Sequence, residues 1–318
     1  MGLKKEKIIL FGKSYSTNQK IAGKLRRIGM QVYDIGYPEF YGNFYESSKH
    51  EIDAILKTVK PDKNIIILES GGLLRNPAYA RFAEHSNIID VELTTQGTYH
   101  KYLFPTINVA RSNIKTTDEP EIIARCVFDM MQKRRLLDKA RNYGVIGAGV
   151  IGKSIDDCLK ANGYSVASYD VKDNDIDDKN KLLEWADCII GATGRDCIDY
   201  SEIFNKVHTL VSVSSADIEF NNILKRVPPP RNMCNLFDDI QVQNIRIING
   251  GFPITFDRKD SSKHKKILMT YGLWLTGLVQ VGLAKEKEVG LVDLNNRYQS
   301  VVKEVYNKYA KVKIWNIF

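Results

Sequence analysis

The sequence has no long uninterrupted apolar run. Its longest apolar segments are broken by glycine or lysine, and none reaches the ~18 residues that a membrane-spanning helix needs. The opening MGLKKEKIIL lacks the apolar stretch of a secretion signal, and Glu6 stands where a myristoylation site has serine or threonine. These absences predict a cytoplasmic protein that has no membrane partner.

Cysteine is scarce, and motifs for metal or nucleic-acid binding are missing. The five cysteines form no CxxC pair, so we expect reduced thiols and no metal site. The net charge of +8 comes from lysines and arginines scattered along the chain, without an RNA- or DNA-binding motif. We therefore expect no nucleic-acid partner, since anionic small ligands or solubility explain the charge equally well.

Strand-like and helix-like segments alternate from the start of the chain. KIILFG (7–12) and NIIILESGG (64–72) have the continuous apolar character of buried parallel strands, and the segments 16–29 and 50–59 have helical spacing. The same alternation begins again at NYGVIGAGVIGKSIDDCLKANGYSVASYD (142–170). This pattern predicts an α/β fold with two doubly wound parallel sheets, the second a Rossmann domain.

Length also favours two domains, because 318 residues exceed what one core usually serves. We expect a substrate-binding domain over 1–122 and a Rossmann domain over 123–258. Residues 259–318 should complete the first domain through a strongly apolar return helix at 266–284. A further helix over 119–140 should separate the two sheets.

A GxGxxG motif lies between the first strand and helix of the second half. Gly147 permits a tight turn, Gly149 lets the backbone approach a pyrophosphate, and Gly152 lets helix and strand pack closely. Asp170 ends the next strand, where its carboxylate can accept hydrogen bonds from ribose hydroxyls and would repel a 2′-phosphate. The motif therefore predicts NAD as the cofactor. The other cofactor-binding candidates in this half are Val150, Ile151, Ala192, Thr193, Gly194, Ser214 and Asn249.

Three runs outside this motif, ESGG (69–72), VELTTQGTYHKY (91–102) and FPTINVARSNIKTTDE (104–119), resemble the S-adenosylhomocysteine hydrolase family. The order of a substrate half, an NAD half and a return helix is also similar to that family. The resemblance implies a bound NAD that oxidises the 3′-hydroxyl of a nucleoside and is reduced again within the same cycle. It also implies a homodimer or homotetramer.

The resemblance assigns roles to individual residues. It implies that Lys115 is the base beside the oxidised hydroxyl and that Glu119, in place of the family's aspartate, is its catalytic partner. Thr94 and Thr95 match a threonine run that contacts ribose and NAD. The remaining substrate-binding candidates are Tyr15, Thr17, Glu69, Ser70 and His264.

Several positions depart from the family pattern. Leu93, Ser70 and Ser215 stand where the family has acid–base residues that serve elimination and water addition. Three readings follow: an NAD-dependent enzyme that oxidises a secondary hydroxyl of a nucleoside- or sugar-like substrate, a genuine S-adenosylhomocysteine hydrolase, or a catalytically inactive regulator that binds NAD and a nucleotide. The retained Lys115 favours the first.

Overall fold

The protein is described here from a computed structural model. The residues that it describes are 6–11, 18–34, 44–59, 64–70, 88–92, 104–173, 175–203, 206, 208–214, 217–226, 235–256, 267–283 and 288–310. The chain divides into two compact units, one comprising Met1–Glu39, Tyr45–Thr117 and Ser262–Phe318, the other Phe40–Phe44 and Asp118–Ser261.

The first unit contains a six-stranded parallel sheet. Its strands follow the order β12-β5-β4-β3-β1-β2. Their bounds are β1 Lys7–Phe11, β2 Gln31–Tyr33, β3 Ile65–Glu69, β4 Ile88–Glu92, β5 Pro105–Asn108 and β12 Gly290–Asp293. The two strands after β1 lie on opposite sides of it, which is the reversal typical of a doubly wound sheet.

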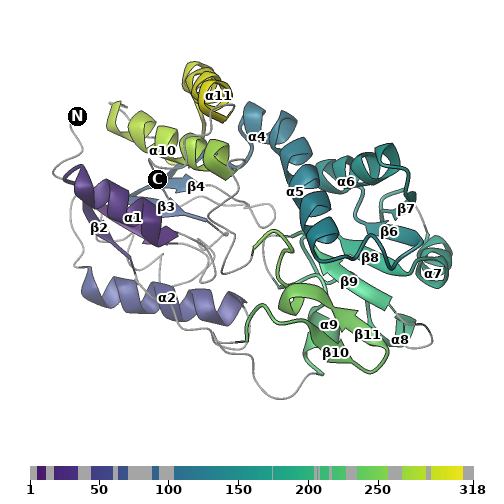
Figure 1. The fold of residues 1–318 in the computed structure, drawn as a ribbon. Helices are drawn as coiled ribbons and strands as arrows, with labels where there is room; N and C mark the ends of the chain where they lie inside the picture. Colours follow the sequence, from purple (N-terminus) through teal and green to yellow (C-terminus); the bar gives the residue numbers. More distant parts are fainter. Residues whose placement is uncertain are drawn as a thin grey trace. The chain divides into compact units, whose positions relative to one another are not determined.

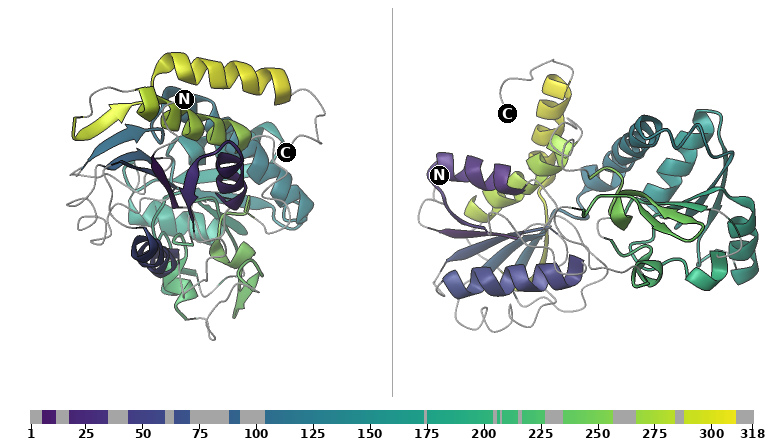
Figure 2. Two further views of the ribbon diagram at one scale, coloured as in Figure 1. Left: turned by 90° about the vertical axis from the view of Figure 1, so that its left-hand side faces the viewer. Right: turned by 60° about the horizontal axis from the view of Figure 1, so that its bottom comes forward.

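Helices cover both faces of this sheet. They are α1 Asn18–Arg27, α2 Phe44–Thr58, α4 Asn113–Thr117, α10 Ile267–Leu283 and α11 Asn296–Ala310. Figures 1 and 2 show α2 on one face and α1 with α10 on the other. Trp274 of α10 is fully buried, and its indole N–H donates to the Val91 carbonyl at 3.0 Å. The return of the chain to the first sheet is therefore confirmed.

The second unit has its own six-stranded sheet in the order β10-β11-β9-β8-β6-β7. All neighbours are parallel except β10 and β11. The bounds are β6 Asn142–Ile146, β7 Ser165–Tyr169, β8 Cys188–Gly191, β9 His208–Ser212, β10 Ile240–Val242 and β11 Ile245–Ile247. Both sheets together confirm the predicted class, two doubly wound α/β units of which the second is a Rossmann unit.

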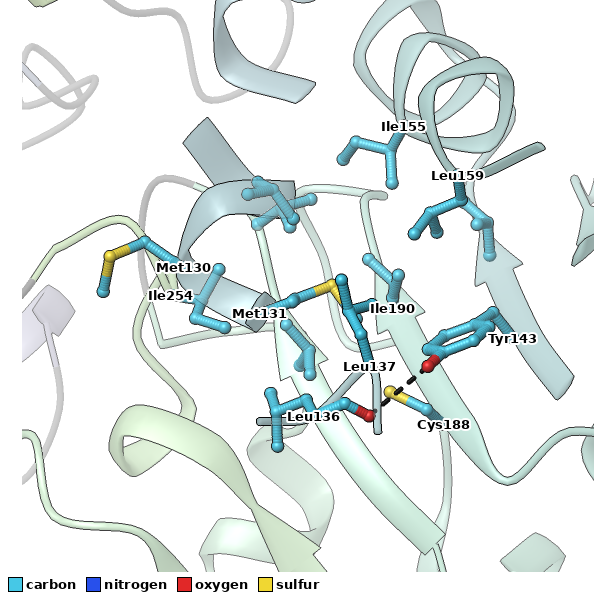
Figure 3. Packing of buried hydrophobic residues seen from close by; sticks show 14 of the residues in the cluster. Met130, Met131, Leu136, Leu137, Tyr143, Ile155, Leu159, Cys188, Ile190 and Ile254 are labelled. Atoms are coloured by element: carbon cyan, nitrogen blue, oxygen red, sulfur yellow. Dashed lines mark hydrogen bonds between the residues drawn. The ribbon is translucent and has the colours of Figure 1, made fainter. Parts of the chain in front are cut away.

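Two apolar clusters fill the faces of this second sheet. One joins α5 Glu119–Lys133 and α6 Val150–Ala161 to the strands; Figure 3 draws 14 of its residues and labels ten of them, among them Met131, Tyr143 and Ile190. The other joins the opposite face to α7 Ile176–Trp185, α8 Tyr200–Ile203 and α9 Asn221–Leu224. A short 3-10 turn, η3 Ile248–Gly251, follows β11.

The helix expected over 119–140 ends earlier, at Lys133. Arg135 has a positive φ of 56°, and the chain then turns so that Leu136 and Leu137 enter the core. The Tyr143 hydroxyl donates to the Leu136 carbonyl at 3.3 Å, as drawn in Figure 3. Packing of these two leucines ends the helix where the sequence alone shows continuous helical spacing. Among the described residues, no helix is long and apolar enough to cross a membrane.

Candidate dinucleotide site

The glycine-rich turn after β6 is closed by two contacts that exclude larger residues. Gly147 has a φ of +101°, and a Cβ there would lie 2.8 Å from the carbonyl of Ala192. A Cβ at Gly152 would lie 1.8 Å from the Gly147 carbonyl oxygen. These two glycines are therefore required by the turn itself, as the motif predicts.

Gly149 differs from both. It precedes α6 with φ −62° and ψ 179°, a backbone conformation open to other residues, and a Cβ there would meet no atom within 4 Å. The first turn of α6, with Val150 and Ile151, presents backbone N–H groups that have no partner within the helix. Such a helix start next to open space is suited to a phosphate group.

Asp170 lies directly beside the turn. Its Oδ2 accepts a hydrogen bond from the Ala148 N–H at 2.8 Å, and its Oδ1 accepts from the Lys172 N–H at 3.1 Å. Both donors are backbone groups, so the carboxylate is fixed directly after β7. The structure thus brings Gly147, Gly149, Gly152 and Asp170 together.

The strand order places the glycine-rich turn at the carboxyl edge of the second sheet, at the point where the order of strands reverses. β7 lies on one side of β6 and β8 on the other, so the loops after β6 and β8 face each other across the point where the sheet reverses. The Ala192 N–H donates to the Ile146 carbonyl at 2.8 Å, which holds the second loop against the first strand. The predicted residues Ala192, Thr193 and Gly194 therefore lie at the switch point.

Glu219 is the residue of this edge that the sequence analysis missed. Its side chain has no exposed surface, and its Oε1 accepts from the Gly194 N–H at 2.6 Å. The Ser214 hydroxyl contacts the same oxygen, and the Thr193 hydroxyl lies 2.8 Å from Oε2. Burial raises the pKa of this carboxyl above its usual value, against hydrogen bonds that lower it. The only signal in the sequence is that Glu219 is one of two acidic residues in the partly apolar run ADIEF (216–220).

Asn249 has a different environment from the one expected of a cofactor ligand. It is fully buried, its Oδ1 accepts from Arg134, and its amide donates to the Pro253 and Phe256 carbonyls at 2.9 and 2.7 Å. These contacts hold η3 and the segment after it. Both amide hydrogens are used within the second unit.

The candidate residues of the first unit are only partly described. Tyr15, Thr17, Thr94, Thr95 and His264 lie outside the described residues.

Glu69 ends β3, Ser70 follows it, and both are buried. Glu69 pairs in register with Glu92, Glu92 with Asn108, and Asn108 with Asp293, which places a row of polar residues at the carboxyl edge of the sheet.

The two predicted catalytic residues fall on separate helices. Lys115 lies on α4, which begins shortly after β5, and Glu119 is the first residue of α5. Both are partly buried. The division into compact units falls between them, after Thr117.

Comparison with known sequences finds relatives without an assigned function. No family model matches the chain. Two uncharacterized proteins of Mycobacterium tuberculosis, MT0113 of strain CDC 1551 / Oshkosh and Rv0104 of strain ATCC 25618 / H37Rv, are 27% identical over 328 residues, 92% of this chain and 63% of theirs. The chain thus spans less than two thirds of the length of these relatives.

Comparison with solved structures finds dehydrogenases and reductases at low similarity. An NADPH-dependent glyoxylate/hydroxypyruvate reductase of Sinorhizobium meliloti, solved with NADP and malonate, is 12% identical over 89% of this chain and 96% of its own, with a TM-score of 0.46. The NAD⁺-bound 3-phosphoglycerate dehydrogenase of Entamoeba histolytica is 15% identical over 87% of this chain and 94% of its own, with a TM-score of 0.44. An NAD-complexed D-isomer specific 2-hydroxyacid dehydrogenase of Lactobacillus delbrueckii is 12% identical over 88% of this chain and 99% of its own, with a TM-score of 0.43.

These matches contradict the prediction of the S-adenosylhomocysteine hydrolase family, which was wrong. The three named structures match over 87–89% of this chain and are a reductase and two dehydrogenases, none of them a hydrolase of that family. Residues 93–103, a part of the runs on which the resemblance depended, lie outside the described residues. The nucleoside substrate, which depended on that resemblance, loses its support.

Proposed function

We propose that this chain is an NAD-dependent oxidoreductase that transfers hydride between the cofactor and a carbon bearing a hydroxyl group in a small substrate. One observation carries the proposal. At the switch point of the second sheet, the turn at Gly147 is closed by steric contacts while Gly149 is open, and Asp170 is fixed beside both. This combination provides a close approach for a pyrophosphate and an acceptor for ribose hydroxyls.

The residues present fit a dinucleotide. Backbone N–H groups of Val150 and Ile151 would face the pyrophosphate, and the positive end of the α6 dipole would favour its charge. Asp170 would accept from the hydroxyls of one ribose, and a 2′-phosphate at that ribose would meet its negative charge. The chemistry that NAD supplies when bound is the acceptance of hydride at its nicotinamide ring.

A proton must move together with the hydride when an alcohol becomes a carbonyl. We propose Lys115 for this step, because a lysine can release and regain a proton whereas an arginine cannot. Glu119 would support it as a carboxylate nearby in the chain. Glu69, Ser70 and Asn108, at the carboxyl edge of the first sheet, are the side chains that we propose for the substrate.

A spectrophotometric screen tests the activity. Purified protein would be incubated with NAD and a panel of small secondary alcohols, including the 2-hydroxy acids named for the matched dehydrogenases, and with NADH and the corresponding ketones. A change in absorbance near 340 nm supports hydride transfer, and Asp170→Ala serves as the cofactor-site control. Tight NAD binding without any absorbance change over the panel would instead favour a regulatory binding protein.

A further inference from the structure

Glu219 ties together the two loops that follow β8 and β9. It accepts from the backbone of Gly194 at 2.6 Å and is bonded to the hydroxyls of Thr193 and Ser214. Gly191 leaves room for it, because a Cβ at Gly191 would lie 2.9 Å from Glu219 Oε2. No ion pair of the described residues includes Glu219, so an ionised carboxylate here would be fully buried without a directly paired cation among these residues, which is costly.

The count of hydrogens around Thr193 favours a neutral carboxylic acid. The Thr193 hydroxyl lies 2.7 Å from the Arg195 carbonyl oxygen and 2.8 Å from Glu219 Oε2, but it has one hydrogen to donate. The Arg195 N–H also donates to this hydroxyl at 3.1 Å. If the Thr193 hydrogen goes to Arg195, the contact with Glu219 is a hydrogen bond only when Oε2 carries the proton.

Thr193 also connects Glu219 with the glycine-rich turn. Its hydroxyl contacts Glu219, and its methyl Cγ2 lies 3.0 Å from the position that a Cβ would take at Gly147. A shift of Thr193 therefore either opens a gap beside the turn or presses on it.

We infer that Glu219 is a positioning residue that, as a neutral carboxylic acid, holds Thr193, Gly194 and Ser214 in the shape that the dinucleotide requires. This inference rests on the proposed function. Glu219 itself is buried behind the two loops and touches no reacting atom. It acts through the loop 192–195 and its contact with the turn at Gly147.

Three ionisable groups lie around Glu219 and have to be separated from it. Cys197 donates its thiol hydrogen to the Glu219 carbonyl at 3.2 Å, and burial raises the pKa of this thiol. Asp196 precedes it, and burial raises the pKa of Asp196 to about 6. Lys179 of α7 is paired with Glu202 at 2.7 Å. Asp196 is the group whose titration could be mistaken for that of Glu219.

Glu219→Gln is the deciding variant, because an amide keeps the size of the acid, one donor and one acceptor, and has no charge. Calorimetric titration with NAD between pH 5 and 9 should give an affinity for Glu219→Gln within about threefold of the wild type at low pH. Glu219→Ala should bind about tenfold more weakly or worse, since buried partners lose their hydrogen bonds. Wild-type affinity should fall as pH rises through the folded-state pKa of Glu219, and Glu219→Gln should lack this fall. The Asp196→Asn variant should show the same fall in NAD affinity with rising pH as the wild type.

A second readout needs no cofactor. A carboxyl whose folded-state pKa is raised stabilises the fold fully below about 4.5 and loses that contribution as pH rises through the folded-state value. The melting temperature of Glu219→Gln should therefore increase relative to the wild type as pH rises. Equal pH dependence of both proteins, or a Glu219→Gln variant as impaired as Glu219→Ala, overturns the inference. If the wild type does not bind NAD but the melting temperatures of the two proteins depend on pH as predicted, the proposed function is wrong and the neutral state of Glu219 is still supported.

Discussion

Replacing Gly149 with alanine should weaken NAD binding and leave the fold intact. The φ of −62° and ψ of 179° at Gly149 are accessible to alanine, and its methyl group would meet no atom within 4 Å. Alanine at the start of a helix costs a few tenths of a kcal/mol or somewhat more, and the loss of glycine's freedom in the unfolded chain returns about as much. The melting temperature should therefore change little.

The cost appears when the cofactor binds. By our proposal the pyrophosphate approaches the backbone at Gly149, so the added methyl occupies space that the ligand requires. Excess volume at a close contact costs about 1–3 kcal/mol. This range corresponds to NAD binding that is weaker by roughly 5- to 150-fold.

Calorimetric titration with NAD and thermal melting would be measured on three alanine variants. Gly23→Ala, in α1, also meets no atom within 4 Å and should bind NAD normally, with a small gain of helix stability. Gly152→Ala should lose both stability and binding, because its Cβ would lie 1.8 Å from the Gly147 carbonyl oxygen. If Gly149→Ala melts and binds NAD as the wild type does, no pyrophosphate approaches this turn and the reasoning fails.

Four further substitutions probe other residues of the protein. Asp170→Ala should weaken NAD binding and reduce the difference between the affinities for NAD and NADP, measured in competitive titrations. An unchanged affinity difference would show that Asp170 does not contact the ribose. Lys115→Arg should keep NAD binding but lower the rate of NAD reduction by about two orders of magnitude, and Glu119→Gln should lower it less; near-normal rates would exclude Lys115 as the base. His208 is buried, and burial lowers its pKa from 6.5 to about 4. Its contribution to folding stability is therefore complete above pH 6.5 and decreases as the pH falls toward 4, because the histidine of the unfolded chain takes up a proton at a higher pH than the buried one does. Urea unfolding should show a loss of about 2 kcal/mol between pH 7.5 and 5 that is absent from His208→Gln, and equal losses in both proteins would contradict this.

The parts of the site that depend on local backbone geometry could be predicted from the sequence. Gly147 and Gly152 must be glycines because a Cβ at Gly147 would collide with Ala192, which follows the neighbouring strand, and a Cβ at Gly152 would collide with the Gly147 carbonyl. These steric requirements fix the spacing of the two glycines in the sequence. Asp170 ends the next strand, where the alternation of strand and helix places it. The parallel sheets could be predicted for the same reason, since the buried strands KIILF and IIILE are apolar throughout except for Lys7 at the start of one and Glu69 at the end of the other.

Contacts between residues distant in the sequence could not be predicted. Glu219 meets Gly194 only because two loops converge on one edge, and no spacing marks that pair. The contact of Asn249, a predicted cofactor-binding residue, with Arg134 joins residues 115 apart in the sequence, and no spacing marks this pair either. The helix ending at Lys133 depends on where Leu136 and Leu137 pack, which the helical spacing of the sequence does not show.

Calorimetric titration of the wild-type chain with NAD and with NADP tests the central claim most directly. The open turn at Gly149 and the fixed carboxylate of Asp170 predict one NAD per chain, bound at least about tenfold more tightly than NADP, because a 2′-phosphate at that ribose meets a negative charge. Absence of heat with either dinucleotide, or equal affinity for the two, would contradict the assignment of this edge as an NAD site.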